Sequence, residues 1–202
     1  MTKIKFCGLS SLCDIEAANR LKPEYIGFVF AKKSKRYISP QTAKSLKERL
    51  LPEIAAVGVF VDETAETIAN LLNGGIIDMA QLHGKEDENF IARLRKLTDK
   101  PLIKAFRINT AEDIKAAMCS TADFVLLDSG AGTGTVFDWS LAQGMKRPYF
   151  LAGGLCAENA RQAVEYLRPY AADVSSGIET DGVKDEIKMA EFAAKVRGEE
   201  KI

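Results

Sequence analysis

The sequence predicts an α/β protein with the (β/α)8 architecture of a TIM barrel, in a single domain that spans residues 1–202. Two observations predict this fold. Short runs rich in β-branched and aromatic residues alternate with amphipathic stretches along the whole chain. Several of these runs, such as residues 26–30 and 57–61, are apolar at nearly every position. Continuous apolarity is typical of strands covered on both faces, as in a parallel sheet.

Eight strands are expected, each beginning a strand–helix unit of roughly 25 residues. They lie at residues 4–7, 25–30, 55–61, 79–82, 102–107, 124–127, 149–152 and 173–175. The helices between them have readable starts. Ser39 before Pro40 predicts an N-cap with proline at the first helical position, and Thr64 predicts another N-cap. Thr110, with Asp113 three residues later, resembles a capping box.

The weakest expected helix is the sixth, at residues 139–144, which is barely one turn long. The last helix is expected at residues 185–196, with Ile187, Ala190 and Ala194 on its apolar face. Strict alternation leaves a closed barrel or an open doubly wound sheet. The turn after the first strand lacks the G-x-G-x-x-G pattern of the open fold, which favours the barrel.

Composition limits the classes of partner. Lys and Arg number 28, as do Asp and Glu, and this balance gives no support for nucleic acid or an anionic membrane as partner. No apolar run approaches a membrane span, and the first residues do not resemble a signal peptide. The cysteine spacings match neither a zinc site nor a disulfide scaffold, so we expect no metal and a cytoplasmic protein with free thiols. The four cysteines are Cys7, Cys13, Cys119 and Cys156.

In (β/α)8 barrels the active site lies at the C-terminal ends of the strands, and phosphate commonly binds after strands seven and eight. Gly153 and Gly154 follow the seventh expected strand, and the turn at Ser175, Ser176 and Gly177 follows the eighth. Backbone N–H groups in such turns can approach an anion closely. The alternative is that these glycines only make tight turns. Two such turns at the two expected loops favour a phosphate site.

Asp128 follows the sixth apolar run, at the rim of the barrel, where partial desolvation suits a general acid. A helix cap or a rim salt bridge is the other interpretation. The loop that follows, with Gly132 and Gly134, could close over a ligand or remain solvated. Cys7 ends the first expected strand, but a buried cysteine is more often an inert apolar residue. From the residues alone, the inert interpretation of Cys7 is favoured.

Three other strand-end residues are candidates for ligand contact. Gln81 and His83 lie at the end of the fourth expected strand, and His83 is the only histidine. A lone histidine is often structural, so ligand contact and a structural role stay open. Within the basic run at residues 32–36, Arg36 is the candidate for binding a carboxylate, because a guanidinium can do so bidentately.

These strand-end motifs together resemble the phosphoribosylanthranilate isomerase family of tryptophan biosynthesis, essentially from end to end. Each motif is weak alone, whereas all of them in this order are highly specific. They lie at residues 5–8, 27–30, 34–40, 57–61, 81–84, 126–129, 132–134, 137–139, 152–155 and 173–179.

The resemblance implies an Amadori rearrangement of N-(5'-phosphoribosyl)anthranilate to 1-(2-carboxyphenylamino)-1-deoxyribulose 5-phosphate, without a metal or an organic cofactor. It implies that Asp128 is the acid that opens the sugar ring and that Cys7 is the base that removes the proton from C2. It also implies that Arg36 binds the anthranilate carboxylate. The remaining substrate-binding residues would be Gln81, His83, Gly132, Gly134, Gly153, Gly154, Ser175, Ser176 and Gly177.

Two alternatives to this isomerase remain. A related barrel isomerase of histidine biosynthesis acts on an aminoaldose, but such enzymes typically use aspartates as both acid and base, and Cys7 argues against that. A non-catalytic phosphosugar-binding barrel is the other, and the presence of both Cys7 and Asp128 argues against it. The expected partner is a small phosphorylated substrate, and the expected assembly is a monomer or a homodimer.

Overall fold

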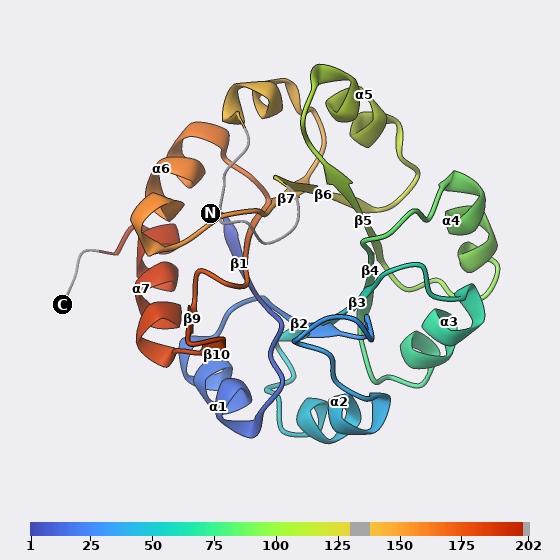
Figure 1. Cartoon of the computed structure of the whole chain (residues 1–202), viewed down its shortest axis with the longest axis horizontal. Coiled ribbons are helices and arrows are strands. Elements are labelled where there is room, and N and C mark those ends of the chain that lie inside the picture. The colour runs from blue at the N-terminus through green and yellow to red at the C-terminus, as the bar shows by residue number, and fades with distance from the viewer. Residues whose placement is uncertain (130–137, 200–202) are drawn as a thin grey trace.

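The computed structural model describes residues 1–129 and 138–199 and contains the predicted closed barrel. Eight parallel strands pair in chain order, and β8 pairs with β1 to close the ring (Figure 1). The strands are β1 (Lys3–Cys7), β2 (Tyr25–Val29), β3 (Ala55–Phe60), β4 (Met79–Leu82), β5 (Leu102–Arg107), β6 (Phe124–Asp128), β7 (Tyr149–Leu151) and β8 (Ala171–Val174).

A ring of helices surrounds the barrel, as Figure 1 shows. The helices are α1 (Leu12–Leu21), α2 (Pro40–Lys47), α3 (Ala65–Asn73), α4 (Glu88–Arg95), α5 (Ala111–Cys119), the 3-10 helix η1 (Trp139–Gly144), α6 (Ala157–Leu167) and α7 (Glu186–Arg197). The predicted N-caps at Ser39 and Thr64 are present, as is the Thr110–Asp113 capping box. The sixth helix is the short one that was expected.

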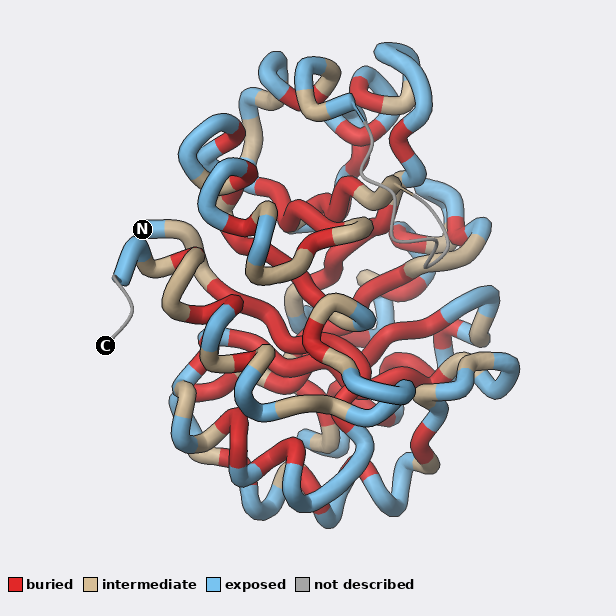
Figure 2. Tube along the Cα trace, turned by 60° about the vertical axis from the view of Figure 1, so that its left-hand side comes forward, coloured by how far each residue is buried: buried red, intermediate tan, exposed pale blue. Residues whose placement is uncertain are grey.

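Alternation along the strands divides the core into two layers. Residues facing the barrel interior include Tyr25, Val57, Met79, Ile103 and Phe150, and they form one buried cluster. Their neighbours in sequence face outward and pack beneath the helices. Figure 2 shows buried chain through the centre and exposed chain at the periphery. Burial on both faces explains the continuous apolarity of the strands.

The end of the chain differs from the sequence prediction in two ways. β8 begins at Ala171 rather than residue 173, because Ala171 and Ala172 already pair with β1 and β7. A two-stranded hairpin, β9 (Glu179–Thr180) with β10 (Val183–Lys184), was not predicted and precedes α7.

The predicted apolar face of the last helix is wrong. Ile187 is 72% exposed. α7 instead buries Met189, Phe192, Ala193 and Val196. Both sets have helical spacing of three and four residues, so spacing alone did not identify the buried face.

None of the helices in the described ranges is both long and apolar enough to cross a membrane.

Candidate active site

A pocket of about 480 Å³ lies at the C-terminal end of the barrel, where the active sites of this fold are built. Its volume is within the range of about 300–1,000 Å³ typical of small-molecule sites. Residues from β1 and from the ends of β3 to β8 line it. They include the predicted site residues Cys7, Arg36, Gln81, His83, Asp128, Gly153, Gly154, Ser175 and Ser176.

Cys7 is the last residue of β1, and its side chain lies among Val29 and Val59. Only 8% of it is exposed. Burial raises the pKa of the thiol, while Lys5 and Lys184 nearby act to lower it. The thiol is thus at the pocket surface in an environment that disfavours its charged form.

Asp128, at the end of β6, lies across the pocket in a chain of polar contacts. The amide Nε2 of Gln81 lies 2.7 Å from Nδ1 of His83. Nε2 of His83 lies 3.2 Å from the carboxylate of Asp128. If the Gln81 amide donates to Nδ1, the neutral ring carries its proton on Nε2 and donates it to Asp128. With that tautomer His83 orients the carboxylate, and its contact with a ligand stays a prediction.

Arg36 is held by a residue that the sequence reasoning did not identify. Its Nε and Nη2 donate to the two carboxylate oxygens of Glu179, at 2.6 and 2.7 Å. Lys184 donates to the same carboxylate at 2.6 Å and to the carbonyl of Ser175 at 2.9 Å. The guanidinium is thus fixed at the pocket rim, and among the described residues its Nη1 donates to no protein acceptor.

The turns after β7 and β8 meet at one side of the pocket. Gly153 and Gly154 have φ angles of +87° and +64°, which favour glycine. Within the described ranges, the N–H groups of Gly153, Gly154 and Ser176 donate to no protein acceptor. All three residues line the pocket, and backbone donors of this kind can bind an anion. Gly177 does not line the pocket, and a Cβ there would collide with the carbonyl of Leu155.

A buried ion pair beneath Cys7 was also missed. Lys5 and Asp173 pair in register on β1 and β8, and Nζ of Lys5 donates to Asp173 at 2.9 Å. Lys5 is fully buried, and Asp173 is 7% exposed. The sequence did contain a signal of this pair, since Lys5 lies between Ile4 and Phe6 in an apolar strand. A charge buried at such a position needs an oppositely charged partner.

Gly132 and Gly134 lie outside the described residues, so their predicted contact with phosphate stays a prediction. In the described part of the chain, no cluster of three or more His, Cys, Asp or Glu residues could hold a metal ion. The four cysteines are free thiols.

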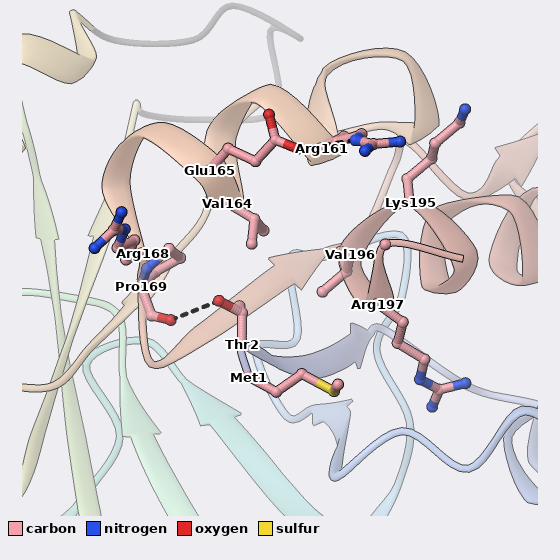
Figure 3. A pocket seen from close by; sticks show the side chains of 11 residues that line it. Met1, Thr2, Arg161, Val164, Glu165, Arg168, Pro169, Lys195, Val196 and Arg197 are labelled. Carbon is pink, nitrogen blue, oxygen red and sulfur yellow. Dashed lines mark hydrogen bonds and ion pairs between the residues drawn. The ribbon is translucent and has the colours of Figure 1, made fainter. Parts of the chain in front are cut away.

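A second pocket, of about 630 Å³, lies between the N-terminus and helices α6 and α7 (Figure 3). Arg161, Arg168, Lys195 and Arg197 make it basic. Two of these cations have protein partners. Arg161 forms an ion pair with Glu165, and Arg197 donates to the carbonyls of Leu21 and Lys22 at the C-terminal end of α1. It contains none of the predicted site residues and lies on the opposite side of the barrel from the strand ends that carry them.

Comparison with known proteins gives a consistent result. The family described as N-(5'phosphoribosyl)anthranilate (PRA) isomerase matches residues 4–195. An N-(5'-phosphoribosyl)anthranilate isomerase of Endomicrobium trichonymphae is 44% identical over 196 residues, which are 95% of this chain and 96% of the relative.

Two solved structures are similar over nearly all of the chain. The phosphoribosyl anthranilate isomerase of Thermotoga maritima has a TM-score of 0.90 at 35% identity, covering 98% of this chain and 100% of that one. A structure of such an isomerase in complex with reduced 1-(o-carboxyphenylamino)-1-deoxyribulose 5-phosphate has a TM-score of 0.88 at 35% identity, with the same coverage. On the family match, the identities and the shared fold, this chain belongs to the N-(5'-phosphoribosyl)anthranilate isomerase family.

Proposed function

We propose that this chain catalyses the Amadori rearrangement of N-(5'-phosphoribosyl)anthranilate, with Asp128 as general acid and Cys7 as general base. The product is 1-(2-carboxyphenylamino)-1-deoxyribulose 5-phosphate. The observation that carries the proposal is that Cys7 and Asp128, the two residues of the family pattern with acid–base chemistry, line one pocket at the C-terminal end of the barrel. Family membership supports the reaction, and this placement supports the assignment of roles.

The chemistry needs one proton donor and one proton acceptor. Asp128 protonates the ring oxygen, the C1–O bond breaks, and the nitrogen lone pair forms a C1=N iminium. The iminium acidifies the proton on C2, which the thiolate of Cys7 removes. The electrons left on C2 form a C1=C2 double bond and neutralise the nitrogen. The resulting enolamine becomes the ketone when its hydroxyl loses a proton and C1 gains one, so the net change is an isomerisation.

Substrate binding follows from the pocket lining. Arg36 would hold the anthranilate carboxylate with the guanidinium edge that Glu179 does not use. The phosphate would accept hydrogen bonds from backbone N–H groups at Gly153, Gly154 and Ser176, with the hydroxyls of Ser175 and Ser176 close by. Neutral composition fits this arrangement, because backbone donors bind an anion without a cluster of cations.

The direct test follows the fluorescence of freshly formed phosphoribosylanthranilate with and without the protein. We expect it to disappear faster with the wild-type chain. Cys7→Ser and Asp128→Asn should each lower kcat by about 100-fold or more, the usual contribution of a general acid or base. Both variants should still bind the reduced product analogue, since neither removes a binding group.

The outcomes separate the alternatives. No turnover by the wild type, with the analogue still bound, would indicate a non-catalytic phosphosugar-binding barrel. Unchanged turnover in Cys7→Ser would remove Cys7 from the mechanism. Cytoplasmic location, the single-domain assignment, the absence of nucleic acid partners and the choice between monomer and homodimer stay predictions.

A further inference from the structure

Five charged residues lie near Cys7 in two linked groups, and the side chains of all but Arg36 are at most 9% exposed. Lys5 and Asp173 form one ion pair, and Arg36, Glu179 and Lys184 form a linked group of three. The side chains of Lys5 and Lys184 are 0% and 4% exposed. Because burying charge is unfavourable unless it is compensated, so many buried charges beside one thiol need a physical reason.

The strand geometry places Lys5 directly below Cys7. The two residues are two positions apart on β1, so their side chains leave the same face of the strand, toward the barrel interior. Asp173 is opposite Lys5 on β8 and holds its ammonium group at 2.9 Å. From β2 and β3, Gly27, Val29 and Val59 lie against Cys7, and none of them carries a charge.

Charge balance around the thiol is incomplete. Lys5, Lys184 and Arg36 supply three cations, whereas Asp173 and Glu179 supply two carboxylates. Among these five residues, a thiolate at Cys7 would bring the formal charge to zero, and a neutral thiol leaves one surplus positive charge. Arg107 and Asp128, which line the same pocket, carry opposite charges and do not change this count. The surroundings therefore favour the charged thiol electrostatically, against the effect of burial.

The separate influences on Cys7 have opposite signs. Burial raises the pKa of the thiol most, Lys5 is the strongest influence that lowers it, and Asp173 raises it. Lys184 also lowers it. Lys5 therefore acts against the desolvation that would otherwise suppress the thiolate.

We propose that Lys5 is a positioning residue whose buried ammonium group, fixed by Asp173, stabilises the thiolate of Cys7. The part of this proposal that concerns turnover rests on the proposed function, in which Cys7 is the base. The electrostatic part concerns the free protein and does not depend on any substrate.

The test measures thiolate formation without turnover. Iodoacetamide alkylates thiolates, so the rate of Cys7 modification against pH, followed by peptide mass spectrometry, gives the titration midpoint of the thiol. Lys5→Met should move this midpoint upward and slow modification near neutral pH by about tenfold. Asp173→Asn should move it downward and speed modification by a similar factor, because Lys5 then acts without its counter-charge.

Two further variants keep the test decisive if Lys5→Met folds poorly with Asp173 unpaired. Lys5→Met combined with Asp173→Leu replaces the pair by apolar side chains of similar volume, which buried pairs often tolerate. Its midpoint should lie between those of the two single variants. Lys5→Arg keeps the charge and should keep a midpoint near that of wild type. The exposed Cys13 and Cys119 serve as internal references in every sample.

The proposal is supported if Lys5→Met and Asp173→Asn move the titration midpoint of Cys7 in opposite directions. Loosened packing would instead make Cys7 more reactive in both variants. The proposal is overturned if the two variants move the midpoint in the same direction or do not move it. Failure of the proposed function gives a different result: the wild-type chain would lack isomerase turnover while the alkylation profiles still differ as described. If the wild-type chain has turnover, and the pH profile of kcat/KM shifts among the variants as the alkylation midpoint does, the proposal on Lys5 and the proposed function are both supported.

Discussion

Cys7 depends on a glycine on the neighbouring strand. Gly27 pairs in register with Cys7, and a Cβ at Gly27 would lie 2.7 Å from Sγ and 3.1 Å from Cα of Cys7. The glycine is thus needed for space, since its backbone is an ordinary strand. This close approach is what allows the thiol to lie at the pocket surface between β1 and β2.

Gly27→Ala is therefore expected to displace the thiol. Overpacking of this kind typically destabilises a protein by about 1–3 kcal/mol, and kcat/KM should fall by more than tenfold because the base moves from its place. Urea unfolding and the isomerase assay measure the two effects. Gly144→Ala is the matched control, since a Cβ there meets nothing within 4 Å. A wild-type kcat/KM in Gly27→Ala would contradict the expectation.

Gln81 influences Asp128 through His83. Gln81 is 1% exposed, and within the described part of the chain its Oε1 has no partner. Gln81→Met removes the contact with Nδ1 of His83 at similar volume, so the tautomer of the ring is no longer fixed. We expect kcat to fall about tenfold with KM little changed, because His83 remains beside the acid but is no longer held in one tautomer, while the groups expected to bind the substrate are unchanged. A rise in KM alone would instead make Gln81 a binding residue.

At the residue scale, the sequence could identify which side chains line the site, but not which charged residues lie beside them. Cys7 and Asp128 are predictable because parallel strands bring their ends to one side of the barrel. Lys5 and Asp173 are 168 positions apart, and only closure of the ring makes them neighbours. No local pattern contains that information.

At the scale of elements, the β9–β10 hairpin is the main feature that strand patterns missed. Its strands are two residues each, too short to show alternation. A signal was present in Asp181-Gly182, whose φ angles of +53° and +80° match the turn that this dipeptide favours. The hairpin matters because it brings Glu179 and Lys184 to Arg36.

Glu179 should link this hairpin to stability in acid. Burial raises the pKa of Glu179, but the hydrogen bonds and charges of Arg36 and Lys184 outweigh it and hold the pKa below its usual value. A lowered folded-state pKa gives stability that is present above the unfolded value and is lost as pH falls through the folded one. We expect the free energy of unfolding of wild type to exceed that of Glu179→Gln by about 2 kcal/mol at neutral pH. This difference should become smaller as the pH is lowered.

Urea unfolding of both chains between about pH 3 and pH 7 measures that difference. Glu165→Gln is the matched control, because the exposed pair of Arg161 and Glu165 is expected to contribute little at any pH. A difference between wild type and Glu179→Gln that stays constant over the range would show that Glu179 stabilises by packing alone.

At the scale of the whole molecule, the barrel interior changes character along its axis. The N-terminal half is closed by Tyr25, Phe124, Phe150 and Tyr170, whose ring centroids are 5.0–6.5 Å apart in contacting pairs. The C-terminal half holds the ion pairs and the pocket. The fold was predictable because the eight barrel strands are buried on both faces. The axial division depends instead on the register of the strands, which the sequence does not display.

Phe150 lies at the centre of the aromatic layer and is fully buried. Phe150→Ala should destabilise the protein by about 3–5 kcal/mol through lost burial and the cavity left behind. Phe150→Leu, which leaves a smaller cavity, should have a smaller effect. The layer lies below the ion pairs, so kcat at a temperature where the variant is folded should stay near that of wild type. If residues 1–202 form one domain, circular dichroism and the fluorescence of Trp139 should report the same lowered midpoint in urea. Two separated transitions would instead divide the chain into parts that unfold independently.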